Sequence, residues 1–209
     1  PKALLTILKN NAVATTFLSE DSGLFRKELT IVSEGVYTFG IFAEDSEGRI
    51  SATFSFTAPV FSLKETSISG IFISPTIELS SNAIARGAIL KIFGQVFPES
   101  KIQIFVFPEN IVFGTTPSVD GKWTFDLDTF LLKEGSHEVW AKAISVDGYQ
   151  SPFSQKLSFL VLAPEIFCRG ADLNFDGKVN LIDFSILLYY WGQKTPKNFC
   201  ADINSDGIV

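Results

Sequence analysis

The sequence predicts a mainly β chain in which two tandem antiparallel sandwiches, the first of them incomplete, precede a small α-helical module. Turn residues interrupt short runs of alternating apolar and polar residues roughly every 8 to 12 positions, a spacing typical of sandwiches. The 209 residues are 46% hydrophobic and include 15 Gly, 9 Pro and 21 Phe. An internal repeat is the third observation, and it divides the chain.

The repeat aligns residues 33–39 with residues 133–139, and the same offset pairs Ser51 with Ser151. It predicts a partial sandwich at 1–60, a full sandwich at 61–163 and a separate module at 164–209. Early strands of the full sandwich are expected at Ile71–Ile73, Ile77–Leu79 and Ala88–Phe93. The first unit shows no counterpart to them, so we expect either that the chain begins inside a domain or that another chain supplies strands.

Each repeat contains one strand whose core face follows from the two-residue period of β structure. That face carries Tyr37, Phe39, Ile41 and Ala43 in the first repeat and His137, Val139, Ala141 and Ala143 in the second. The opposite face of the second strand, with Glu138, Trp140 and Lys142, suits solvent. The Asp-Gly pairs at 120–121 and 147–148 predict tight turns.

These features resemble the bacterial Ig-like repeats that occur in tandem on surface and secreted proteins. The resemblance rests on Gly94 to Pro98, residues 120–123 and 134–137, and the segment from Asp147 to Ser151. It implies a seven-stranded type of sandwich that serves as a spacer or adhesive module and has no common active site. A fold of this kind does not by itself fix a function.

After Ala163 the composition changes, and residues 172–183 follow the pattern of an EF-hand loop, with Gly177 at its sixth position. Calcium is a hard cation that takes six to eight oxygen ligands, and this spacing brings such oxygens together. The predicted ligands are Asp172, Asn174, Asp176, the Lys178 carbonyl, Asp183 and, through water, Asn180. A solvated acidic turn is the alternative.

Because Asp183 replaces the usual Glu, the loop and the apolar segment after it resemble the type I dockerin repeat. A dockerin has two such repeats, and the second is identified with Asp202, Asn204, Asp206 and Ile208, ending before its ninth and twelfth positions. The resemblance also implies that Leu181, Ile182, Leu188 and Tyr189 contact a cohesin-like partner. The alternative is that these four residues pack inside the molecule.

A helix is expected after the loop, ended by Gly192, with an apolar stripe of Phe184, Leu187, Leu188 and Trp191 that must be buried. Cys168 and Cys200 precede the two loops, and we predict a disulfide between them, with two buried thiols as the alternative. A disulfide implies an oxidising compartment.

Composition and motifs together argue against several functions. The net charge of −6 without a basic run excludes a nucleic-acid or anionic-lipid partner, and no stretch approaches the roughly 20 apolar residues of a membrane helix. His137 is the only histidine and is expected in the core, so we predict no enzyme. Trp123 is expected in the core, whereas Trp140 is a candidate sugar-binding platform.

The sequence therefore predicts a non-catalytic protein, secreted or on the cell surface, with spacer sandwiches and a calcium-dependent dockerin-like module that docks to a scaffold or surface partner. Two alternatives stay open. One is the subunit of an extracellular filament that assembles head-to-tail with neighbouring copies by strand complementation, as a homopolymer. The other is a sugar-binding adhesin.

Overall fold

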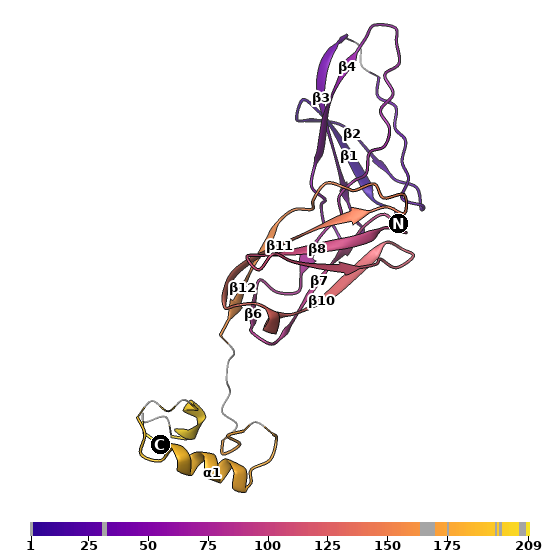
Figure 1. Cartoon of the computed structure of the whole chain (residues 1–209). Coiled ribbons are helices and arrows are strands. Elements are labelled where there is room, and N and C mark those ends of the chain that lie inside the picture. The colour runs from indigo at the N-terminus through magenta and orange to yellow at the C-terminus, as the bar shows by residue number, and fades with distance from the viewer. Residues whose placement is uncertain are drawn as a thin grey trace. The chain divides into compact units, whose positions relative to one another are not determined.

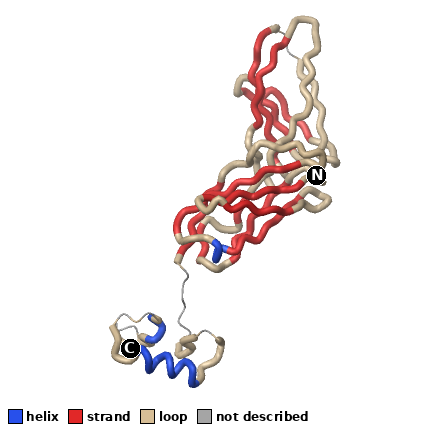
Figure 2. Tube along the Cα trace, in the orientation of Figure 1, coloured by secondary structure: helices blue, strands red, loops and turns tan. Residues whose placement is uncertain are grey.

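The computed structural model describes residues 2–30, 33–163, 170–174, 176–194, 196, 198–204 and 208–209 (Figures 1 and 2). Contacts divide the chain into two compact units, Pro1–Ala163 and Pro164–Val209. The first unit is built almost wholly of strands and the second holds the helix α1 (Leu181–Tyr190), so the predicted mainly β architecture is confirmed. The described helices include none that is long and apolar enough to cross a membrane.

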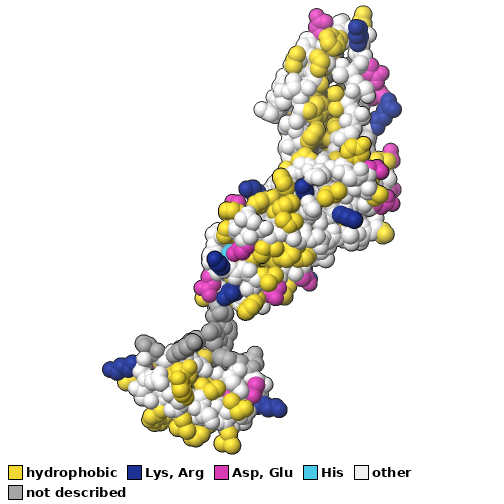
Figure 3. All heavy atoms as spheres, in the orientation of Figure 1, with side chains coloured by type: hydrophobic (Ala, Val, Ile, Leu, Met, Phe, Trp, Pro, Cys, Tyr) yellow, Lys and Arg dark blue, Asp and Glu magenta, His cyan; other side chains and the backbone are white. Residues whose placement is uncertain are grey.

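The N-terminal repeat forms a four-stranded antiparallel sheet in the order β2-β1-β3-β4. Its strands are β1 (Leu4–Lys9), β2 (Ala12–Leu18), β3 (Gly35–Glu44) and β4 (Phe54–Val60). The β1–β2 turn places Asn10 and Asn11 at φ 51° and 65°, the left-handed conformation that a tight hairpin needs. Figure 3 shows a column of apolar side chains on this part of the molecule, so the sheet is not fully covered.

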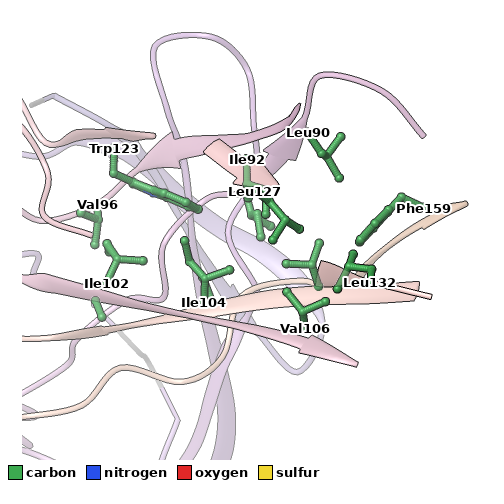
Figure 4. Close-up of a cluster of buried hydrophobic side chains, with 14 of the residues drawn as sticks. Leu90, Ile92, Val96, Ile102, Ile104, Val106, Trp123, Leu127, Leu132 and Phe159 are labelled. Atoms are coloured by element: carbon green, nitrogen blue, oxygen red, sulfur yellow. The ribbon is translucent and has the colours of Figure 1, made fainter. Parts of the chain in front are cut away.

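The second repeat forms a complete sandwich in which a three-stranded sheet, β10-β7-β5, packs on a five-stranded sheet, β6-β12-β11-β8-β9. Side chains from both sheets fill the core, including Leu90, Ile104 and the predicted core residue Trp123 (Figure 4). The elements are β5 (Glu78–Leu79), β6 (Ala83–Ala85), β7 (Ile89–Gln95), β8 (Lys101–Phe107), β9 (Ile111–Thr115), β10 (Lys122–Asp128), η1 (Thr129–Leu131), β11 (Gly135–Ile144) and β12 (Leu157–Leu162).

The structure shows how far the internal repeat extends. The order β2-β1-β3-β4 in the first repeat matches β9-β8-β11-β12 in the second. The inward face of β11, from His137 to Ala143, is buried as the two-residue period predicts, and Phe39 and Ile41 are buried on β3. Gly121 and Gly148 have φ of 77° and 84°, as the predicted turns require.

One prediction about strands is corrected. Residues 71–73 form no strand, although Phe72 packs against the core, and Pro75 nearby has no amide hydrogen to donate to a ladder. Residues 24–30 also form no strand. In the second repeat β10 pairs with β7, and the described residues of 2–30 supply no equivalent of β7.

The C-terminal unit packs α1 against η2 (Phe199–Ala201) around a small core of Leu173, Cys200 and Ala201. Gly192 follows the helix at φ 75°, so the predicted helix stop is confirmed. The predicted buried stripe is wrong, because Phe184, Leu188 and Trp191 are exposed. The inward face instead carries Asp183, Ile186, Leu187 and Tyr190.

Candidate functional site

The loop at residues 172–183 is held by hydrogen bonds from its own backbone to its polar side chains. The Gly177 amide donates to Asp172 Oδ2 at 3.0 Å, and the Asp176 amide donates to Asn174 Oδ1 at 3.1 Å. The Lys178 amide donates to Asp176 Oδ1 at 2.9 Å. These bonds fold the described part of the loop into successive turns and bring the side chains predicted to bind calcium onto one short segment.

Asp183 closes the loop and also begins the helix. Its Oδ1 accepts hydrogen bonds from the amides of Leu173 and Asn174, and its Oδ2 accepts one from Asn180 at 2.9 Å. The Asn180 amide, followed by those of Asn174 and Leu173, lowers the pKa of Asp183 against the opposing effect of burial. Asn180 is the helix N-cap and accepts from the Ile182 amide at 2.8 Å, a role that sequence reasoning missed.

Asp172 carries the one observation that points to a cation. The residue is only 4% exposed, and its Oδ1 has no hydrogen-bond partner, while Oδ2 is bonded to Gly177. A buried carboxylate oxygen without a partner costs free energy, and a bound cation removes that cost. The chemistry of the donor set, carboxylates with an Asn amide and a backbone carbonyl, is the set that calcium takes.

The loop fits calcium only with some rearrangement. Among the described residues, no three His, Cys, Asp or Glu side chains gather closely enough to hold a metal. Asp176 is exposed, and both lone pairs of Asp183 Oδ1 are taken by amides, which leaves one lone pair on Oδ2. Asp183 can therefore bind a cation through Oδ2 without losing its hydrogen bonds, while Asp176 would have to turn inward.

The second predicted half-loop is described only in part. Asp202 is half-buried and Asn204 is exposed, whereas Asp206 lies outside the described residues. Ile208, which was predicted to belong to the second calcium half-site, pairs with Lys194 in a β-bridge. Cys200 is completely buried and disulfide-bonded; its predicted partner, Cys168, lies outside the described residues.

The four residues predicted to contact a partner all lie on the surface of the C-terminal unit. Leu181 is 80% exposed and Tyr189 is 74% exposed, and Ile182 and Leu188 are also exposed. Ile182 and Tyr189 line a shallow depression together with Ser185, Ile186, Tyr190 and Asn198. Figure 3 shows the apolar side chains gathered on this unit.

A polar network that sequence reasoning missed joins the two repeats inside the first unit. Asp45 Oδ2 accepts from Arg49 Nε at 2.7 Å and from the Thr76 hydroxyl at 2.7 Å. Thr76 Oγ1 in turn accepts from the Gln95 amide at 2.8 Å. Arg49 also pairs with Glu78, so the turn at 45–49 of the first repeat is fastened to the second. The sequence signal for this network was the charged pair Asp45 and Arg49. At the equivalent turn positions the second repeat has the uncharged residues Ser145 and Tyr149.

Gly94 makes this joint possible on the side of the second repeat. A Cβ atom at position 94 would collide with the Thr76 carbonyl oxygen. The backbone at Thr76 therefore lies closer to Gly94 of β7 than any side chain at position 94 would permit. The Thr76 amide donates to the Gln95 carbonyl at 3.0 Å, which holds the segment in place.

His137 lies in the core, as predicted, at 2% exposure. Its Nε2 lies 3.1 Å from Glu109 Oε1, and its ring stacks on Phe159. Burial raises the pKa of Glu109, but the hydrogen bonds from His137 and from the Lys133 amide outweigh it and leave the pKa below its usual value. The pair joins β11 to the turn between β8 and β9 inside the sandwich.

The chain matches no protein-family model and no curated protein. It is similar to a solved structure of a biofilm associated protein BSP domain, with 19% identity and a TM-score of 0.33 over 80% of this chain and 26% of that one. It is also similar to fibronectin(III)-like modules of Clostridium thermocellum CbhA, with 14% identity and a TM-score of 0.34 over 80% and 82% of the two chains.

A third similar structure is a tetra-tandem repeat in the extending region of a large adhesion protein, with 15% identity and a TM-score of 0.36 over 78% of this chain and 42% of that one. The chain thus spans about a quarter of the first of these proteins, 26%, and less than half of the third. Its own strand order is the basis for the sandwich fold described above.

Proposed function

We propose that the chain is a non-catalytic extracellular protein whose sandwich repeats act as a spacer and whose C-terminal unit is a calcium-dependent, dockerin-like module for a cohesin-like partner. The partner is carried by a scaffold or a cell surface. The observation that supports this most is the buried, unpartnered Oδ1 of Asp172 in a loop with calcium-type ligands. A cation at this point would complete the loop and would stabilise the start of α1 through Asp183.

Calcium would be held by Asp172, Asn174, Asp176, the Lys178 carbonyl and Asp183, with Asn180 acting through water. The ion would supply positive charge to a loop whose carboxylates otherwise repel one another. The residues themselves do the remaining work. Asp183 and Asn180 cap the helix, and the helix holds Leu188 and Tyr189 on the surface.

Calorimetric titration with calcium tests the metal site. We expect binding to the whole chain, and loss of binding in Asp172→Ala and Asp183→Ala. Asp126→Asn, which changes an exposed acid on β10, is the matched control and should bind as the wild type does. Unchanged helical circular dichroism and an unchanged melting temperature of the C-terminal unit on addition of EDTA would contradict the coupling of calcium to folding.

The docking surface needs a separate test. Leu181, Ile182, Leu188 and Tyr189 expose a large apolar area, which on a soluble domain marks an interaction site. Binding to purified cohesin-like domains should require calcium and should be lost in Leu188→Asp or Tyr189→Asp. Val119→Asp, at a residue that is 98% exposed in the first unit, should have no effect. If the chain binds calcium but no cohesin-like domain, the calcium site stands and the proposed docking function is refuted.

Strand complementation is a second candidate function, favoured by one observation. Strand β2 is an edge of the N-terminal sheet, and its sequence from Ala12 to Leu18 contains neither a charge nor a proline. Edge strands usually carry such residues to prevent pairing with other chains. Light scattering and electron microscopy of the wild type and of Thr16→Lys test this, since uniformly monomeric wild-type particles would remove the filament.

A further inference from the structure

The outer face of the five-stranded sheet carries a cluster of aromatic rings. Trp140 of β11 stands opposite Phe105 of β8, with their ring planes at 6° and their centroids 6.2 Å apart. Phe153 stands at 89° to both rings and is 49% exposed. A sandwich normally presents polar residues on the face that meets water. Trp140 and Phe105 are half-buried and Phe153 is exposed, so this face presents aromatic surface where the fold does not require it.

Lysine side chains surround these rings. Lys142 Nζ lies 5.6 Å from the centroids of both Phe105 and Phe153, and Lys156 Nζ lies 4.3 Å from that of Trp140. Each ammonium group is thus held beside an aromatic face by a cation–π contact. The ion pair between Lys156 and Glu138 is 3.5 Å long and exposed, so it contributes little and leaves the lysine available.

The charge of this face is opposite to that of the whole chain. The outward positions of β8 and β11, together with the neighbouring Lys156, hold three lysines, Lys101, Lys142 and Lys156, and one acid, Glu138, whereas the chain has 17 basic and 23 acidic residues. A local positive surface on an acidic protein favours an anionic ligand and increases its rate of encounter. The ligand must therefore offer negative charge together with a surface that suits aromatic rings.

An acidic sugar polymer has both properties. One face of a pyranose ring is rich in C–H groups, whose partial positive charge complements the negative face of an aromatic ring. Carboxylate or sulfate groups on the same ring can pair with an ammonium a few ångströms away. A sheet face is also open along its strands, so an extended chain can cross it.

We propose that the β8–β11 face binds an acidic polysaccharide, with Trp140 and Phe105 contacting the sugar rings and Lys142 and Lys156 pairing with its carboxylate or sulfate groups. In the free protein the two lysines cover the rings. The anionic groups of the polymer would draw the ammonium groups to the margin of the cluster and expose the ring faces. This site uses neither calcium nor residues 164–209, so it is independent of the docking proposed above.

The test uses the full chain and three polymers: polygalacturonate, its methyl-esterified form, and heparin. Affinity electrophoresis and calorimetry should show binding to polygalacturonate or heparin, weaker binding to the esterified polymer, and a decrease in affinity with added salt. Trp140→Ala should weaken binding about tenfold or more, as expected for an aromatic anchor. Phe130→Ala is the matched control, because Phe130 is 66% exposed and lies in η1, which follows β10 of the opposite sheet.

A double variant, Lys142→Gln with Lys156→Gln, keeps the rings and removes the charge. It should lose the preference for the charged polymer over the esterified one, and EDTA should change no result. Carboxylate ligands are indicated if polygalacturonate binds more tightly than heparin, and sulfate ligands if the order is reversed. No binding to either acidic polymer, or equal binding by the wild type and a folded Trp140→Ala variant, would overturn the proposal.

Discussion

The two repeats carry the same turn at equivalent positions, and they use it differently. Residues 45–49 and 145–149 close with the same amide-to-carbonyl bond, from Gly48 to Asp45 at 3.1 Å and from Gly148 to Ser145 at 3.0 Å. In the first repeat Asp45 is buried and bonded to Thr76 of the next sandwich, although residues 46–48 are exposed. In the second repeat the turn is exposed, with Tyr149 71% accessible.

This difference distinguishes the bonds that each repeat needs in order to fold from the bonds that join the first repeat to the second. The backbone bonds of the turn are common to both copies and therefore belong to the fold. Asp45 and Arg49 occur in one copy only, and they convert a turn into a joint through bonds across the boundary to Thr76 and Glu78. A joint can thus arise from two side chains without any change in the course of the backbone.

The largest effect should come from removing the acid of the joint. Asp45→Ala leaves Arg49, whose side chain is only 9% exposed, without its main partner, and we expect a loss of about 3 kcal/mol in the free energy of unfolding. Ser145→Ala at the equivalent position removes one hydrogen bond to the Tyr149 amide and should cost about 1 kcal/mol or less. Denaturant unfolding of both variants measures the contrast. Equal losses would show that the joint adds nothing to the turn.

Low pH should selectively weaken the contacts of Asp45 that join the two repeats. Burial raises the pKa of Asp45, but the hydrogen bonds from Thr76 and Arg49 outweigh it and hold the pKa below its usual value. A lowered folded-state pKa means that the stabilisation is present above about pH 4, the range of a free aspartate, and is lost as the pH falls through the folded-state value. Unfolding measured between pH 7 and pH 2 should show the wild type losing more stability than Asp45→Asn.

A second difference between the repeats concerns position 37 and its equivalent, 137. Tyr37 is half-buried and its hydroxyl donates to the Ser33 carbonyl, whereas His137 is buried against Glu109. Glu109→Gln should cost about 1.5 kcal/mol, because it removes the charge from a buried hydrogen bond. Glu134→Gln changes an exposed acid nearby and is the control. A melting temperature equal to that of the wild type would contradict a stabilising role for the pair.

The smallest effect tests the equivalence of the repeats. Ser51 Oγ accepts from the Ala43 amide at 3.0 Å, and Ser151 Oγ accepts from the Ala143 amide at 2.9 Å. Ser51→Ala and Ser151→Ala should therefore each lower the free energy of unfolding by nearly the same amount, about 1 kcal/mol. Unequal losses in chemical denaturation would show that the surroundings of the two serines differ more than their geometry does.

Sequence patterns predicted the features that depend on neighbouring residues. The two-residue period of β11 gave its buried face, and the Asp-Gly pairs gave the turns at Gly121 and Gly148. The spacing of the loop at 172–183 predicted the residues that the structure brings into one turn system, together with the helix that follows. All of these depend on local backbone geometry, which a single segment determines.

The features that were missed depend on partners distant in sequence. Residues 71–73 are apolar and were expected to form a strand, but in the structure they pair with no strand. On α1, the stripe of Phe184, Leu188 and Trp191 was as apolar as the face that packs, and only the tertiary contacts decide between them. The Asp45–Thr76 bond links residues far apart in the chain and left no periodic signal.

The close approach of Thr76 to Gly94 restricts how this protein can change over evolutionary time. Most surface positions of the sandwich accept many residues, but position 94 accepts only glycine while the joint is intact, because any side chain would displace the Thr76 backbone. A lineage that lost this glycine would have to move the Thr76 segment away from β7 inside the second sandwich, and this would displace Thr76 from Asp45 of the first repeat. The joint to the first repeat therefore depends on a packing requirement inside the second one.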